Sequence, residues 1–107
     1  MSKPVPKLTC DFYQAAGGDE PVREWLRGLD AEICTIIGKD ILKVQWRWPI
    51  SRPLVRSAHD GNIYRVFFCI EGRSMVLLHG FMKKTQATPK REIDIARARQ
   101  RTFRRKS

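Results

Sequence analysis

The chain has 107 residues, of which 42% are hydrophobic, and this composition predicts one soluble globular domain with a modest core. No apolar run approaches the roughly 20 residues that cross a bilayer, and we expect no secretory signal. Three well-separated cysteines, Cys10, Cys34 and Cys69, contain no C-x-x-C pair. They argue against a disulfide framework or a zinc site and indicate a reducing, cytoplasmic setting.

Charge is distributed unevenly along the chain. The formal net charge is +10 and the isoelectric point is near 10.2. Residues 1–46 hold six Lys/Arg and seven Asp/Glu, whereas residues 47–107 hold fifteen and four. This regional excess of positive charge favours an anionic polymer such as nucleic acid, or an acidic partner protein, over an ordinary solvated basic surface.

The first thirty residues indicate a strand and a short helix. Residues 7–13 alternate loosely between apolar and polar side chains, as a strand does. Asp19 or Glu20 can then cap a helix that has Pro21 in its first turn. Apolar residues follow at helical spacing, at Val22, Trp25, Leu26 and Leu29.

A second, longer helix follows. Asp30 can cap it, and Pro49 ends it because proline cannot continue a helix. Its apolar stripe consists of Ile33, Ile36, Ile37, Ile41 and Val44. We expect the three tryptophans, Trp25, Trp46 and Trp48, to lie in the core rather than to form a base-stacking platform.

The middle of the chain indicates an antiparallel meander. Residues 54–56 lead into a predicted turn at 57–62, in which Asp60–Gly61 is a typical hairpin signal. Residues 63–70 form the clearest strand, rich in β-branched and aromatic side chains. Arg65 is the one charge in this strand, and because a buried charge is costly we expect it on an open, charged side of the sheet.

A strand that begins at Ser74 is apolar on both faces and then changes into a basic segment that runs to Pro89. His79 lies on this strand, and Lys83 and Lys84 lie at its exit. A strand that leaves the core is a rigid mount for such charged groups.

The last helix is predicted to have Thr88 as its cap and Pro89 at its first position. Its end, residues 97–107, holds no acid and is expected to be a basic helix end or a solvated tail. The elements together predict a single α+β domain over residues 1–107.

Four segments carry a family resemblance, namely residues 18–26, 53–56, 64–68 and 77–89. In this order they resemble the phage-derived branch of the RelE/HigB-type toxins, often called Gp49-like proteins. The resemblance extends from about Leu8 to Arg99. Its most specific run is His-Gly-Phe-x-Lys-Lys-Thr-x-x-Thr-Pro; the basic charge alone is not specific.

The resemblance implies a RelE-like fold: two N-terminal helices and a C-terminal helix on a small, twisted, mainly antiparallel sheet of three to four strands. It also implies a type II toxin that cleaves messenger RNA, often in the A site of the 70S ribosome, without a metal or other cofactor. The RNA 2′-hydroxyl attacks the adjacent phosphate. A cognate helix-turn-helix antitoxin is the expected protein partner.

That reaction requires cations around the phosphorane and groups that move protons. We expect Arg65, Lys83 and Lys84 to converge on one phosphate, through a bidentate guanidinium and compact ammonium groups. His79 is either an acid or base, or a hydrogen-bonded histidine of the sheet. Further expected RNA or phosphate contacts are Arg56, Arg91 and Arg97.

The chain departs from the family pattern after Arg56, where a loop and a strand that usually carries basic residues are missing. Either residues 54–57 act as a shortened strand, with Arg56 replacing the missing arginine, or the sheet lacks a strand. The second case leaves an exposed edge that invites a homodimer.

Three functions are therefore compatible with the sequence. The first is an mRNA interferase toxin. The second is a catalytically weakened relative that still binds antitoxin or RNA, and the third is a plain basic binding protein of a phage or mobile element.

Overall fold

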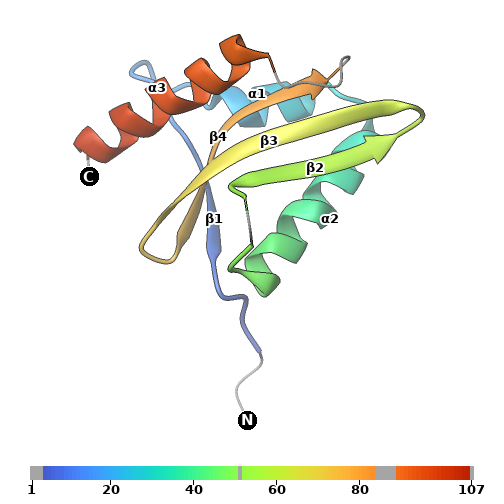
Figure 1. Ribbon diagram of the computed structural model, residues 1–107, viewed down its shortest axis with the longest axis horizontal. Helices are drawn as coiled ribbons and strands as arrows, with labels where there is room; N and C mark the ends of the chain where they lie inside the picture. Colours follow the sequence, from blue (N-terminus) through green and yellow to red (C-terminus); the bar gives the residue numbers. More distant parts are fainter. Residues whose placement is uncertain (1–3, 51, 84–88, 107) are drawn as a thin grey trace.

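The computed structural model describes residues 4–50, 52–83 and 89–106 (Figure 1). They form three helices and a four-stranded mixed sheet, so the predicted α+β class is confirmed. The elements in chain order are β1 (Thr9–Phe12), α1 (Pro21–Arg27), α2 (Ala31–Arg47), β2 (Leu54–His59), β3 (Asn62–Glu71), β4 (Ser74–Lys83) and α3 (Lys90–Lys106). No helix within the described ranges is long and apolar enough to cross a membrane.

The sheet has the strand order β1-β4-β3-β2. β2, β3 and β4 form the predicted antiparallel meander. β1 lies parallel to β4, with Thr9 opposite Ser74, and is the one parallel member of the described sheet. β1 and β2 are the two edge strands of the described sheet, and β2 pairs only with β3.

The β2–β3 hairpin is longer than the sequence indicated. β2 continues through His59, so the prediction of a turn over residues 57–62 is wrong and the loop is only Asp60–Gly61. Both loop residues have positive φ (50° and 79°), as in the two-residue turns whose twist matches that of the flanking strands. Ser57 can occupy a buried strand position because its hydroxyl donates to Asp40 of α2 at 2.6 Å. The sheet therefore keeps a strand before β3, as the shortened-strand alternative expects, although this strand runs to His59 rather than to Ser57. That Arg56 replaces the missing arginine stays a prediction.

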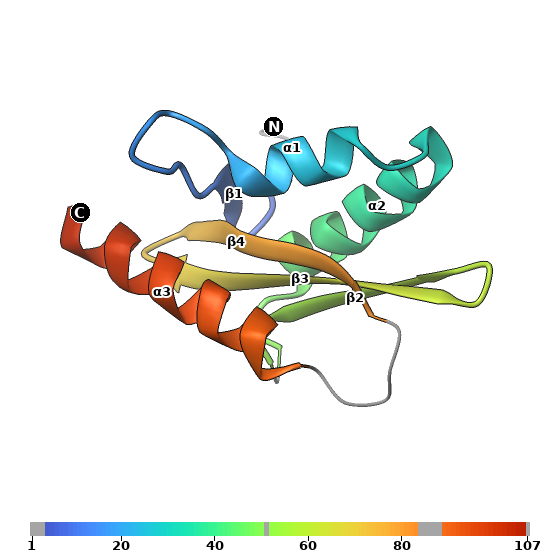
Figure 2. The ribbon, with the colours of Figure 1, turned by 90° about the horizontal axis from the view of Figure 1, so that it is seen from above.

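The helices cover both faces of the sheet (Figure 2). α1 and α2 pack on one face, where the larger core gathers Val22, Ile37, Val66, Met75 and Leu77. α3 crosses the other face over β3 and β4, where the smaller core gathers Tyr13, Cys69, Val76, Leu78 and Ala96. The end of the β2–β3 hairpin projects past α3 (Figure 2). Part of this second face is therefore not covered by α3.

Two of the three tryptophans are partly buried and pack against the larger core, close to the expected core position. Trp25 packs near Tyr64, with ring centroids 6.5 Å apart, and Trp48 meets Phe68 edge-on at 5.9 Å. Trp46 is 42% exposed, so the expectation that it lies in the core is wrong. It falls on the side of α2 that faces away from the sheet.

The helix starts use different contacts from those predicted. Glu20 and Asp30 occupy the N-cap positions of α1 and α2, but neither side chain makes a capping hydrogen bond. Glu20 instead pairs with Arg23 at 3.1 Å. Pro89 precedes α3 rather than opening it, and its carbonyl accepts the first bonds of that helix. Thr88 lies outside the described residues.

Candidate functional site

Three positive side chains share the open part of the α3-facing side of the sheet. Arg56 on β2 stands directly opposite Arg65 on β3. Lys83 on β4 stands opposite Ile63, two residues before Arg65. Because alternate strand residues share a face, Arg56, Arg65 and Lys83 all belong to one face. We call these three residues the cationic cluster.

The charges of the cationic cluster act on one another at Lys83. Partial burial and the positive charges of Arg65 and Arg56 hold the pKa of the Lys83 ammonium below its ordinary value. Like charges directly opposite each other on paired strands are unfavourable. An anion placed between them relieves this repulsion, so the cationic cluster has the chemistry of a phosphate site.

A row of stacked rings borders the cationic cluster. Phe81 stands opposite Arg65 on β4. Its ring stacks on Phe67 on one side, with centroids 5.8 Å apart, and on His79 at 5.7 Å. Neither phenylalanine was singled out from the sequence, although Phe67 is two positions from Arg65 and therefore had to share its face.

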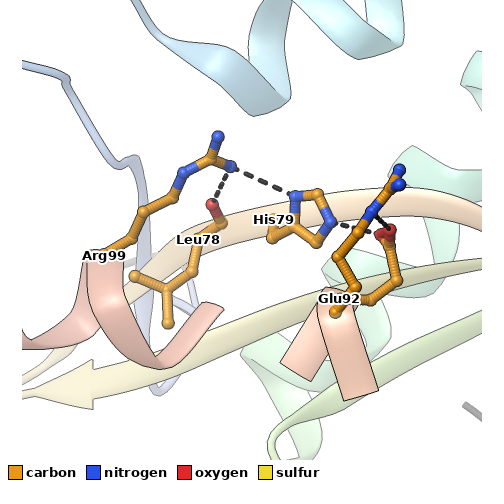
Figure 3. A network of polar contacts seen from close by, with 5 residues as sticks. Leu78, His79, Glu92 and Arg99 are labelled. Atoms are coloured by element: carbon orange, nitrogen blue, oxygen red, sulfur yellow. Dashed lines mark hydrogen bonds and ion pairs between the residues drawn. The ribbon is translucent and has the colours of Figure 1, made fainter. Parts of the chain in front are cut away.

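His79 links β4 to α3 through both ring nitrogens (Figure 3). Its Nε2 lies 2.5 Å from a carboxylate oxygen of Glu92, and its Nδ1 lies 3.2 Å from the Arg99 guanidinium. A guanidinium only donates, so Nδ1 accepts and Nε2 carries the proton that faces Glu92. Arg99 also donates to the Leu78 carbonyl at 2.9 Å. In this arrangement His79 is a cross-link between strand and helix.

The partners of His79 are themselves enclosed. The side chains of His79 and Glu92 are each 13% exposed. Burial lowers the pKa of Arg99, while Tyr13 and Glu92 act in the opposite direction. Arg99 also lies 5.8 Å from the centre of the Tyr13 ring, a cation–π distance. Sequence reasoning missed Glu92 and Arg99 because nothing local marks which residues of a basic helix turn inward.

Two other predicted site residues, Arg91 and Arg97, lie on α3 rather than on the sheet. Arg91 is exposed on α3, with its Nε 3.7 Å from Glu92. Arg97 is also exposed on α3. Lys84 lies outside the described residues. Within the described ranges, no three His, Cys, Asp or Glu side chains gather in a way that could hold a metal ion.

A groove of about 300 Å³ lies between α3 and the sheet. Its walls include Phe67 and Leu78 from the sheet, and Ile93, Ala96, Arg97 and Gln100 from α3. Phe67 belongs both to this groove and to the ring row beside the cationic cluster. The groove and the cationic cluster therefore adjoin.

Comparison with known proteins adds one finding. Residues 24–101 match the family model described as "Phage derived protein Gp49-like (DUF891)". The match spans α1 to α3, and so includes the cationic cluster, His79 and the groove. No curated protein matches the chain.

Proposed function

Because the chain belongs to the Gp49-like family of phage-derived proteins, a RelE-type toxin family, we propose that it is a metal-independent endoribonuclease toxin of a type II toxin–antitoxin system. Its substrate is messenger RNA, engaged on the ribosome. Membership of such a family suggests an antitoxin partner. We propose that this partner is a cognate helix-turn-helix protein, and a homodimer through the β2 edge stays a prediction.

The observation that carries the proposal is the cationic cluster. In the reaction, the 2′-oxygen forms a bond to the adjacent phosphorus and the bond from phosphorus to the 5′-oxygen breaks. The 2′-hydroxyl loses a proton, the leaving oxygen gains one, and a cyclic phosphate and a 5′-hydroxyl remain. Negative charge builds up on the phosphorane between these events. Arg65 can bind two of its oxygens at once and Lys83 supplies a compact charge beside it, with Arg56 opposite.

Among the described residues, Lys83 suits the role of proton donor. Its pKa is lowered by burial and by the neighbouring arginines, so its ammonium gives up a proton more readily than that of an ordinary lysine. Lys84 remains a second candidate. His79 can exchange protons with RNA only after it releases Glu92 or Arg99, and in the arrangement described it positions α3 instead.

The test is induction in bacteria with primer-extension mapping of message ends. We expect growth arrest and new message ends with the unaltered chain, and neither with Arg65→Gln or Lys83→Gln. Lys39→Gln is the matched control, because it removes one exposed positive charge on α2, on the other side of the sheet. New message ends that persist at full level in both cluster variants would refute the proposed site.

A second candidate function is RNA or antitoxin binding without cleavage. It is favoured by the residue types around the cationic cluster. On the stretch of β3 from Ile63 to Phe67 and on the paired residues of β2 and β4, the described residues of this face include no carboxylate that could serve as a base. Growth arrest without new message ends, together with retained RNA binding, would identify this weakened relative.

A further inference from the structure

The groove between α3 and the sheet continues the surface on which the phosphate is proposed to lie. Arg65 and Phe67 are alternate residues of β3, so their Cα atoms are about 7 Å apart on the same face. Phe67 lines the groove, and Leu54, its cross-strand partner on β2, is two residues from Arg56. The groove therefore begins one strand repeat away from the cationic cluster, on the same face of the sheet.

The lining of the groove fits a flat heterocycle with polar edges. Phe67, Leu78, Ile93 and Ala96 are apolar, which suits the faces of a ring. Gln100 carries an amide that both donates and accepts hydrogen bonds, and it lines the groove from α3. Arg97, also in the lining, donates only. A volume of about 300 Å³ lies at the lower limit of small-molecule sites and is sufficient for one base.

We propose that this groove is a nucleobase subsite, which takes one unstacked base of an RNA whose phosphates lie on the cationic cluster. The inference rests on the proposed RNA-binding function and adds a place where base identity can be read. Proteins commonly recognise single-stranded RNA by seating bases against aromatic side chains and bonding their edges. Arg97 lines the groove, and Arg65, paired with Arg56, lies two residues from Phe67 of its wall; this positive charge complements a nucleic acid.

The experiment measures RNA tetranucleotides by fluorescence anisotropy. The full RNA carries all four bases, and each of four abasic RNAs lacks the base at a different position, so every abasic RNA has the same phosphates as the full RNA. We expect one abasic position to weaken binding about tenfold, in the range found when base stacking is removed. The dependence of affinity on salt should be equal for the full and the abasic RNAs, because it reports phosphate contacts.

Gln100→Trp tests the location, because an indole at this position fills the groove. We expect it to reduce the preference for the full RNA over the abasic RNA to less than twofold, with unchanged affinity for the abasic RNA. Ala98→Trp is the matched control: it adds the same side chain two residues away on α3, on roughly the opposite side of the helix. Circular dichroism and thermal unfolding should show that both variants remain folded.

Each result distinguishes the subsite from the function on which it rests. Equal binding of the full and the abasic RNAs by the unaltered chain overturns the subsite and leaves RNA binding intact. Failure of both kinds of RNA to bind overturns the subsite, whereas the proposed function is decided separately by the primer-extension test in bacteria. If Gln100→Trp keeps the base preference, the base does not lie in the groove, and the nucleobase subsite is refuted.

Discussion

Arg56 and Arg65 stand directly opposite each other on neighbouring antiparallel strands. Two positive side chains at paired positions repel, so this arrangement lowers the stability of the hairpin in the absence of an anion. A phosphate between them reverses the effect. The pair therefore connects the stability of the fold with its proposed ligand.

The first prediction follows from this repulsion. Arg56→Gln should raise the free energy of unfolding by about 0.2–1 kcal/mol at low salt, and the gain should shrink at high salt because ions screen the repulsion. The same variant should bind RNA more weakly. Urea unfolding at two salt concentrations measures the first effect, with Lys39→Gln as the control for loss of one charge. A destabilised Arg56→Gln protein would contradict the account.

The second prediction concerns the attachment of α3. Glu92→Gln removes a nearly enclosed carboxylate that faces His79, and we expect it to cost about 1–3 kcal/mol of stability and to speed amide exchange in α3. Glu71→Gln is the control, since Glu71 bonds Arg104 of the same helix at 2.6 Å but at the surface. It should cost no more than about 1 kcal/mol. Equal losses in the two variants would show that His79 and Glu92 do not fasten the helix.

The third prediction concerns the contact between Gly80 and Trp25. A Cβ at Gly80 would overlap the indole ring of Trp25, so Gly80→Ala should lower the free energy of unfolding by about 1–3 kcal/mol. Gly38→Ala offers the opposite case. A Cβ at this exposed position in α2 meets no atom within 4 Å, and the change should stabilise the protein by about 0.5–1 kcal/mol. Thermal unfolding of the two variants would reveal the difference in sign.

The fourth prediction is a loss of stability in alkali. Burial, with a smaller contribution from the charge of Glu71, raises the pKa of the Cys69 thiol from 9.0 to about 11. The unfolded chain therefore loses this proton at lower pH than the folded chain. The stabilising effect of the protonated thiol is complete below pH 9 and disappears as the pH rises to about 11.

Urea unfolding between pH 8 and pH 11 tests this effect. Cys69→Ala should make the decline in stability with pH shallower, by at most about 1.4 kcal/mol per pH unit. Part of the decline should remain, because the pKa of Cys10 is also raised to about 11. An unchanged slope in Cys69→Ala would contradict the assignment.

Much of the fold could be predicted because its signals are local. Helical spacing in α2 and β-branched residues in β3 identified these elements, and Asp60–Gly61 located the hairpin turn. The full length of β2 was not predicted, because Ser57 is polar and did not look like a buried strand residue. Only its hydrogen bond to Asp40 of α2 makes this position suitable for burial. Pairing of β1 with β4 has no local signal at all.

Of the candidate site, too, only the part with a local signal could be predicted from the sequence. Arg65 stood out as a lone charge in an apolar strand. Lys83 lies on the same face because it pairs with Ile63, two residues before Arg65, and this register is known only from the structure. That His79 would meet Glu92 and Arg99 depended on how α3 docks, which is a property of the whole fold. The groove likewise exists only between two elements that are distant in sequence.

The parallel pairing of β1 has a consequence for the order in which the protein assembles. Thr9 and Ser74, which bond across this junction, are 65 positions apart. During synthesis β1 is made before β4, the last strand of the described sheet, and it cannot pair until residues 74–83 have been made; closing so long a loop is slow. The described sheet can therefore be complete only after β4 has been synthesised.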